Sequence, residues 1–438
     1  MQGGDVFHSL LSILGDCIEG LPDPRKGKNR RYSMHNIVLS AFSVFFTQSP
    51  SFLSYQRSMQ QNKGSNNGRT LFGIDTIPTD AQIRNVLDAV NYRHLDPVFI
   101  QALSLLQKNK ELESYRVLDK QLLVCMDGTE FFSSTALSCA FCSTRTRSDA
   151  TVSHYHSALT PAIVQPGTSR VIPLPPEIIS PQDGHEKQDC ENAAAKRWLS
   201  RWASLCTTLG GVTILGDDLY SKLPVCRAMQ QAGVQFILVC KPTSHPWLAE
   251  WIRLCDAKKD LHERRTVVWN GRKHLTHITR WISGVPLTSD ADTLQLNWAE
   301  LLVLDEKGQE ISHNSWVTTH PLSDTNVEAI IQAGRCRWKI ENENNNTLKT
   351  KGYHLEHNFG HGAKELSNLL VTLNLVAFLF HTVLELYDAR YRLLRHTLVR
   401  RDTFFNDIRA LTRYIHFDSW QGMLQFMLRG LELEDPGG

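Results

Sequence analysis

Long apolar runs are missing from this sequence. Its most apolar segment, LLVTLNLVAFLFHTVL (369–384), is short and contains Asn374 and His381, so it fits a buried helix better than a membrane span. The start, MQGGDVFHSLLSILGDC, lacks the basic residues and uninterrupted apolar stretch of a signal peptide. The ten cysteines are too scattered for a disulfide scaffold. We therefore expect a cytoplasmic protein with reduced thiols and no membrane association.

The sequence also has little excess charge and no nucleotide-binding loop. The net charge is +2 over 438 residues, and no G-x4-G-K-[ST] motif is present, which argues against ATP use. Basic residues nevertheless gather in PRKGKNRR (24–31) and in a second cluster made of Arg390, Arg392, Arg395, Arg400 and Arg401. Such runs are commonly solvated surface. The alternative is contact with DNA phosphates, for which the first run offers Arg25, Lys26, Lys28, Arg30 and Arg31.

The chain divides by texture into five parts. Residues 1–112 have apolar positions at helical spacing, separated by Pro, Gly and Asn clusters. Residues 113–261 contain three continuous apolar runs typical of buried strands, LLVCM, GVTIL and VQFILVC, around an irregular stretch at 139–190. Alternation and turn signals in 262–320 predict an all-β insertion. Helical patterns return in 321–364 and 365–438. The expected fold class is α/β, with a mixed sheet flanked by helices.

Two acids follow the first two apolar runs. Asp127 comes at the end of LLVCM, and Asp217 at the end of GVTILG. Acids at the ends of adjacent buried strands have a fixed spacing, which suits Mg²⁺ or Mn²⁺ bound for phosphodiester chemistry. An aspartate at a strand end is also a common turn residue, so these two alone do not decide between a site and a turn.

A third acid, Glu341, lies in a helix predicted at about 325–350. Helical spacing puts it on one face with Val327, Ile331, Trp338 and Leu348. That face looks core-directed, where a carboxylate is costly unless it is paired or bound to metal. Arg337, Asn345 and Lys349 follow the neighbouring stripe, where they could hold phosphate or orient the acid. A surface helix with an Arg337–Glu341 pair is the alternative, and Glu343 points away.

The segments MDGTEFFSS, GDDLYS and RWKIENENNNTLK, in this order, resemble the three catalytic boxes of DDE transposases of bacterial insertion sequences. These enzymes have a ribonuclease-H-like core. The pattern is most similar to the group with a β-strand insertion before the glutamate and a Y-x2-R-x3-E-x6-K signature. LPDPRKGKNRRYSMHNIVLSAF and IPTDAQIRNVLDAV also resemble N-terminal segments of such enzymes, so the resemblance spans most of the chain.

The resemblance implies a ribonuclease-H-like sheet interrupted by the β insertion, with a helical DNA-binding region at 1–112. It implies that Asp127, Asp217 and Glu341 hold two Mg²⁺ or Mn²⁺ ions, and that Arg337 and Lys349 contact DNA. The implied partners are double-stranded DNA, both terminal inverted repeats and target, and a second copy of the chain in a homodimer on DNA. The implied activity is cut-and-paste transposition. A ribonuclease-H-like nuclease without strand transfer and a non-catalytic DNA-binding descendant of a transposase are the alternatives.

The match departs from the signature at two positions. Gly334 stands where the signature has tyrosine, and Leu348 where it has lysine, with Lys349 one residue late. Second-strand cleavage through hairpin ends is therefore not implied. Asp218 could replace Asp217, but the Asp-x-x-Tyr spacing to Tyr220 favours Asp217.

A structural zinc site is a separate prediction. Cys139-x2-Cys142 is a good half-site, because one short loop can direct both sulfurs at a tetrahedral ion. The other half is either His154 with His156 or His185 with Cys190, and the close His-x-His spacing favours the second pair. Two unligated thiols are the alternative.

Two further features of the sequence have both a functional and a structural interpretation. Trp269, Trp281 and Trp316 in the β segment either stack on a displaced DNA base or belong to the core. The glycines of EHNFGHG (356–362) either let backbone amides approach DNA phosphate or form a plain loop.

Overall fold

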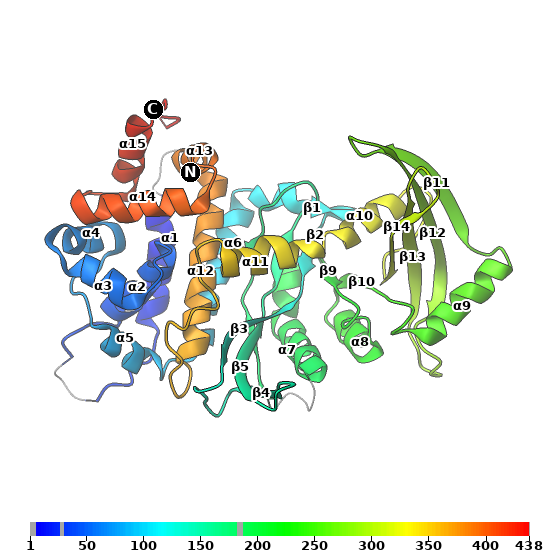
Figure 1. The fold of residues 1–438 in the computed structure, drawn as a ribbon, viewed down its shortest axis with the longest axis horizontal. Coiled ribbons are helices and arrows are strands. Elements are labelled where there is room, and N and C mark those ends of the chain that lie inside the picture. The colour runs from blue at the N-terminus through cyan, green and yellow to red at the C-terminus, as the bar shows by residue number, and fades with distance from the viewer. Residues whose placement is uncertain (1–5, 27–29, 182–186, 438) are drawn as a thin grey trace.

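The computed structural model describes residues 6–26, 30–181 and 187–437. It is a mixed α/β structure in which helices form both ends of the chain and a mixed sheet flanked by helices lies between them (Figure 1), as the sequence predicts. The N-terminal helices are α1 (Val6–Glu19), α2 (Met34–Phe46), α3 (Phe52–Gln60), α4 (Asn62–Phe72), α5 (Asp80–Leu87) and α6 (Asp96–Lys108). Short 3-10 turns Tyr92–Leu95, Glu111–Tyr115 and Leu118–Lys120 follow α5 and α6.

The central sheet has ten strands in the order β11-β12-β13-β14-β10-β9-β2-β6-β7, with β1 paired to β2. Its core strands are β2 (Gln121–Cys125), β9 (Val212–Gly216) and β10 (Gln235–Val239), which are parallel neighbours. These are the three predicted apolar runs. Beyond β2 the sheet continues with antiparallel strands. Strand β2 pairs with β1 (Arg116–Val117) and with β6 (Ala162–Val164), and β6 pairs with β7 (Ile172–Pro173). Helices α7 (Lys187–Thr208) and α8 (Leu223–Gln231) follow in the chain, and α8 packs on β10.

The segment predicted as a β insertion forms β11 (His262–Trp269), β12 (His274–Pro286), β13 (Gln295–Leu304) and β14 (Glu310–Thr318). These antiparallel strands continue the central sheet, because β14 pairs with β10. They extend beyond the body as a lobe, together with α9 (Pro246–Ala257), which packs against β12 (Figure 1).

The stretch 139–190 is not irregular, and that prediction is wrong. It contains β4 (Ser143–Thr146), β5 (Val152–Leu159) and β8 (Glu177–Ile179), besides β6 and β7. Strands β4, β5 and β8 form a second sheet together with β3 (Gly128–Ser134). Its order is β3-β5-β4, and β8 pairs with β5. The central strand β5 buries polar residues such as Ser153, His156 and Ser157, so its sequence lacks the apolar run expected of a buried strand.

The C-terminal helices are α12 (Leu366–Tyr387), α13 (Ala389–Thr397), α14 (Arg401–Tyr414) and α15 (Trp420–Gly430). Helix α12 is long and apolar enough to cross a membrane by length and composition, but 94% of its most apolar window is buried inside the structure. It packs against α2, where the rings of Phe42 and Phe380 lie 5.1 Å apart. The prediction of a buried helix is confirmed.

Candidate active site and metal cluster

Asp127 and Asp217 leave the central sheet side by side. Cys125 pairs with Leu215 in the parallel ladder, and the Met126 amide donates to the Leu215 carbonyl at 2.9 Å. Each aspartate therefore lies just beyond the carboxyl end of its strand, on neighbouring strands at the same edge of the sheet. The sequence predicts this arrangement because both strands are continuous apolar runs that end at an acid.

The acids crowd one another electrostatically. Burial, followed by the charges of Glu191, Asp217 and Glu341, raises the pKa of Asp127 to about 7, and Arg337 partly opposes this shift. Burial also raises the pKa of Asp217, against hydrogen bonding from the Leu219 amide and the charge of Arg337. The charges of Asp217 and Glu341 thus both act on Asp127, and the charge of Arg337 acts on both aspartates.

Glu341 does not lie on a core-directed face, and that prediction is wrong. Its side chain is 51% exposed and pairs with Arg337 at 2.6 Å, the surface pair named as the alternative. Trp338, expected on the same buried face, is 45% exposed. The reason is local geometry: α10 (Val327–Arg335) gives way to a π-helix, Ile340–Asn345, before α11 (Asn346–Thr350). A wider π-turn changes which residues share a face, so spacing rules for an α-helix fail there.

Asn345 occupies the inward position that Glu341 was expected to take. Its side chain is buried, and its Nδ2 donates to Asp127 Oδ2 at 3.0 Å. Its Oδ1 accepts from Thr160 Oγ1 at 2.8 Å. Asn345 therefore fixes the Asp127 carboxylate from the helix that also contains Glu341.

The π-helix also bears on the two departures from the signature. A π-turn holds one residue more than an α-turn, so Lys349 rather than Leu348 follows Glu341 along the same side of the helix. Leu348 is fully buried, whereas Lys349 is half-buried and pairs with Glu356 at 2.8 Å. At Gly334, an added Cβ would lie 2.9 Å from Trp316 Nε1 and 3.0 Å from Ile237 Cγ2, so no tyrosine fits there.

Glu191 is a fourth acid at the site that no sequence motif indicated. It lies on α7, is buried, and accepts from the Tyr220 hydroxyl at 2.6 Å and from the Gly128 amide at 3.2 Å. These bonds join α7 to the residues that follow each aspartate, Gly128 after Asp127 and Tyr220 after Asp217. Asp218, by contrast, accepts from the Lys241 amide at 2.6 Å and fixes the end of β10.

Removing the Tyr220 hydroxyl tests this connection. Because the buried Glu191 carboxylate would lose a charge-assisted donor, Tyr220→Phe is expected to lower the free energy of unfolding by about 1–3 kcal/mol. Urea unfolding followed by circular dichroism measures the change. Tyr414→Phe is the matched control, since Tyr414 is 70% exposed and should give no change. Equal losses in the two variants would contradict the structural role of the Tyr220–Glu191 bond.

A second cluster brings together Cys139, Cys142, His156 and His361. The ligand atoms of these four residues all lie within 4.8 Å of one another, and the cluster could bind a metal such as zinc. Among the described side chains of residues 6–26, 30–181 and 191–437, no other set of histidine, cysteine or acidic residues is this tight. Asp127, Asp217 and Glu341 therefore do not form a set of ligand atoms as tight as this cluster.

Five of the six distances between ligand atoms in the cluster are close to those of a tetrahedron, and the sixth, from Cys139 Sγ to His361 Nε2, is at most 4.8 Å. The two sulfurs are 3.8 Å apart, the two Nε2 atoms 3.2 Å apart, and the other three sulfur–nitrogen separations are 3.3 to 3.5 Å. Zinc bonds of about 2.3 Å to sulfur and about 2.0 Å to nitrogen imply separations of roughly 3.3 to 3.8 Å. His361 Nδ1 donates to the Gly362 carbonyl at 2.9 Å, which leaves Nε2 free to ligate. Burial lowers the pKa of His156 to about 4, so its ring is neutral, as a ligand must be.

The predicted second half of this site needs correction. His156 belongs to one of the two pairs considered, but its partner is His361 rather than His154. His185 and the side chain of Cys190, the preferred pair, lie outside the described residues. His361 comes from EHNFGHG, so this loop contributes an imidazole and not only a turn. Nothing local to Cys139 and Cys142 could have indicated a ligand more than two hundred residues away.

The basic run near the N-terminus is partly committed to local structure. Both Arg25 and Arg30 pair with Asp23 at 2.8 Å, and Arg25 also donates to the Tyr32 carbonyl. Lys26 and Arg31 are exposed, while Lys28 lies outside the part of the chain that the structure describes.

Of the three candidate stacking tryptophans, two are core residues. Trp281 and Trp316 are each 3% exposed in the sheet, so stacking on a base is contradicted for both. Trp269 is 56% exposed at the end of β11.

Comparison of the chain with protein-family models finds no match, and no curated protein matches it. The geometry of the sites must therefore support any functional assignment.

Proposed function

We propose that this protein is a DDE transposase with a ribonuclease-H-like core, acting as a homodimer on double-stranded DNA. The observation that carries the proposal is the pair Asp127 and Asp217 at the ends of neighbouring parallel strands, with the charge of Glu341 acting on Asp127. The order of these acids along the chain and the strands β11–β14 before Glu341 agree with the resemblance of the three sequence boxes.

The donor set suits two Mg²⁺ or Mn²⁺ ions. Burial and neighbouring like charges raise the pKa of Asp127 to about 7, so the ionised acids are unfavourable alone, and divalent cations would stabilise them. The residues that would hold the ions are Asp127, Asp217 and Glu341, whose oxygen atoms are the ligands that these hard cations prefer. When bound, such ions polarise the scissile phosphate, activate the nucleophile and stabilise the leaving oxygen.

The neighbouring side chains have distinct roles in this proposal. Asn345 orients Asp127 through its hydrogen bond. Arg337, 22% exposed and paired with Glu341, is placed to bind a DNA phosphate once the acid turns to a cation. Lys349, on the same side of the helix, would bind a second phosphate.

Two displacement reactions account for transposition at one site. First, water attacks the phosphate at the transposon end, and the P–O3′ bond breaks to release a 3′-hydroxyl and a 5′-phosphate. That hydroxyl then attacks a target phosphate, forming a new P–O3′ bond while the target's own 3′-oxygen leaves. Neither step needs a covalent enzyme intermediate, because positioning of the reactants supplies the catalysis.

The test uses purified protein, Mg²⁺ and the DNA that flanks its gene. We expect cleavage at inverted repeats, and joining of pre-cleaved ends to a target plasmid, both abolished by chelation of Mg²⁺. Cleavage without joined product would instead identify a nuclease lacking strand transfer. DNA binding with neither reaction would indicate a non-catalytic descendant of a transposase.

We further propose that the Cys139, Cys142, His156 and His361 cluster binds a structural Zn²⁺ ion. Four protein ligands close the tetrahedron and leave no open position for a substrate, which is typical of structural zinc. The ion would fasten strand β5 and the loop before β4 to the segment that precedes α12.

A further inference from the structure

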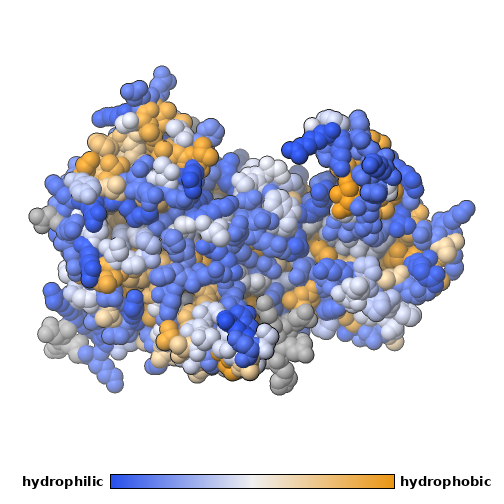
Figure 2. Space-filling view, viewed as in Figure 1, coloured by the Kyte–Doolittle hydropathy of each residue, from blue (hydrophilic) through white to orange (hydrophobic). Residues whose placement is uncertain are grey.

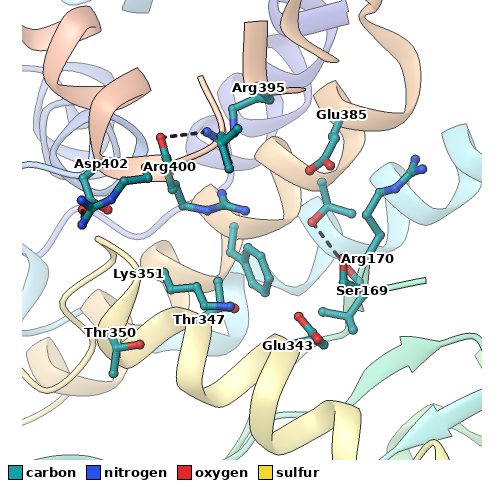
Figure 3. A pocket seen from close by; sticks show the side chains of 15 residues that line it. Ser169, Arg170, Glu343, Thr347, Thr350, Lys351, Glu385, Arg395, Arg400 and Asp402 are labelled. Carbon is teal, nitrogen blue, oxygen red and sulfur yellow. Dashed lines mark hydrogen bonds and ion pairs between the residues drawn. The ribbon is translucent and has the colours of Figure 1, made fainter. Parts of the chain in front are cut away.

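A basic cavity of about 530 Å³ lies above α11, between the catalytic helix and the C-terminal helices. Figure 3 shows Thr347 of α11 and Lys351, which follows that helix, on one side, and Arg395 and Arg400 on the opposite side. Arg170 and Arg401 also line it. In the space-filling view the surface over α11 is largely hydrophilic, whereas apolar residues gather over α14 and α15 (Figure 2).

The cations of this cavity differ in their partners, and one of them, Arg400, pairs with Asp402 at 3.5 Å. Within the described ranges, no carboxylate lies at ion-pair distance from Arg170, Lys351, Arg395 or Arg401. Arg395 Nε is buried without a hydrogen bond. Arg401 donates to the Tyr353 hydroxyl at 3.1 Å, a neutral partner. The cavity also has acids in its lining, Glu343, Glu385 and Asp402, and the charge of Glu385 acts on Arg395 and Arg401 from beyond ion-pair distance.

The other arginines of the same sequence cluster are satisfied internally. Arg390 pairs with Asp435 at 2.7 Å, and Arg392 donates to the carbonyl of Leu386 at 2.8 Å. The difference matters because partly buried guanidinium groups without an ion pair are costly unless an anion meets them. The unpaired charges therefore point to a ligand with several negative groups.

The cavity is continuous with the catalytic helix. Glu343, Thr347 and Thr350 line it, and they lie on the π-helix and α11 segment that begins beside Glu341. From Glu341 to Thr350 the helix rises roughly 13 Å, a span of about four nucleotides at 3.4 Å each. A strand held at the acids would reach the cavity within a few nucleotides.

We infer that this cavity binds backbone phosphates of the DNA strand that passes the active site. Its cations come from both sides of an opening much larger than one phosphate group, which fits successive phosphates better than a single small anion. The inference rests on the proposed function and deepens it, because it names the part of the protein that holds the strand beyond the reacting bond.

The test measures DNA affinity over a range of salt concentrations. Lys351→Gln and Arg395→Gln are made in an Asp127→Asn background, so that DNA is not cut, and binding is followed by fluorescence anisotropy. Each variant is expected to bind a transposon-end duplex about 5- to 20-fold more weakly, with a salt slope lower by about one. Arg413→Gln, an exposed arginine away from the cavity, is the control and should change neither value.

Lys351 is exposed, so its variant remains informative if the Arg395 variant fails to fold. Wild-type affinity and salt slope in folded Lys351→Gln would overturn the inference. Inorganic phosphate is the second probe. If phosphate raises the melting temperature of the wild type but not of Arg395→Gln, while both proteins bind DNA equally well, the cavity binds a small anion and the inference also fails. A protein that binds DNA through the cavity but never cleaves it would refute the transposase proposal alone.

Discussion

Replacing Asp127 by Asn is expected to reduce Mg²⁺-dependent DNA cleavage by about a thousandfold or more, on the order of 4 kcal/mol of transition-state stabilisation. The substitution keeps the shape of the side chain and an oxygen for the Asn345 amide, but removes the charge that a divalent cation needs. Gel-based cleavage of an end-labelled duplex, at saturating Mg²⁺, measures the effect.

Stability distinguishes this loss from misfolding. Because neighbouring acids and burial raise the pKa of Asp127, its ionised form opposes folding when no metal is bound. Metal-free Asp127→Asn should therefore unfold no more easily than wild type. Asp218→Asn is the control. Asp218 accepts a hydrogen bond from the Lys241 amide and is not one of the proposed catalytic acids, so its variant should keep most of the activity. Full cleavage by Asp127→Asn would refute the catalytic assignment.

Removal of the proposed zinc ion is expected to have the largest effect on stability. The wild-type protein purified without chelator should contain one zinc per chain by atomic absorption. Cys142→Ser should lose the ion and lower the free energy of unfolding by several kcal/mol, on the order of 3 or more. The reason is that the remaining ligands come from the loop before β4, strand β5 and the segment before α12, which the ion would hold together.

The matched control is Cys255→Ser. Cys255 is half-buried on α9, outside the cluster, and its variant should keep both the zinc and the stability of wild type. If Cys142→Ser retained a full complement of zinc, or the wild type contained none, the cluster would be four unligated side chains. Unfolding on addition of a strong chelator, reversed by zinc, would support the proposal independently.

Much of the fold could be predicted from local sequence. Continuous apolar runs identify β2, β9 and β10, and helical spacing identifies the helical ends of the chain. Strand β5 could not be found in this way, because half of its buried side chains are serine or histidine, whose burial depends on partners elsewhere in the chain. The strands β11–β14 were visible as hairpins, but their pairing with β10 is a long-range property that no local pattern encodes.

The site was less predictable than the fold. Asp127 and Asp217 follow from strand ends, whereas the orientation of Glu341 depends on a π-helix that breaks the periodicity on which the prediction relied. Glu191 has no motif, and its position arises because α7 packs beside the strand ends. Of the metal cluster, only the Cys139–Cys142 half-site is a local feature of the sequence.

The position of His361 has a consequence for how the protein matures. A chain still being synthesised can bring together the first three residues of the proposed zinc site, but the site stays incomplete until residue 361 leaves the ribosome. Helix α12, the partner of the early helix α2, is made later still. Contacts between such distant parts of a chain form slowly, so the face of α2 that packs against α12 stays uncovered until α12 has been made, although α2 can already pack against α1 and α5.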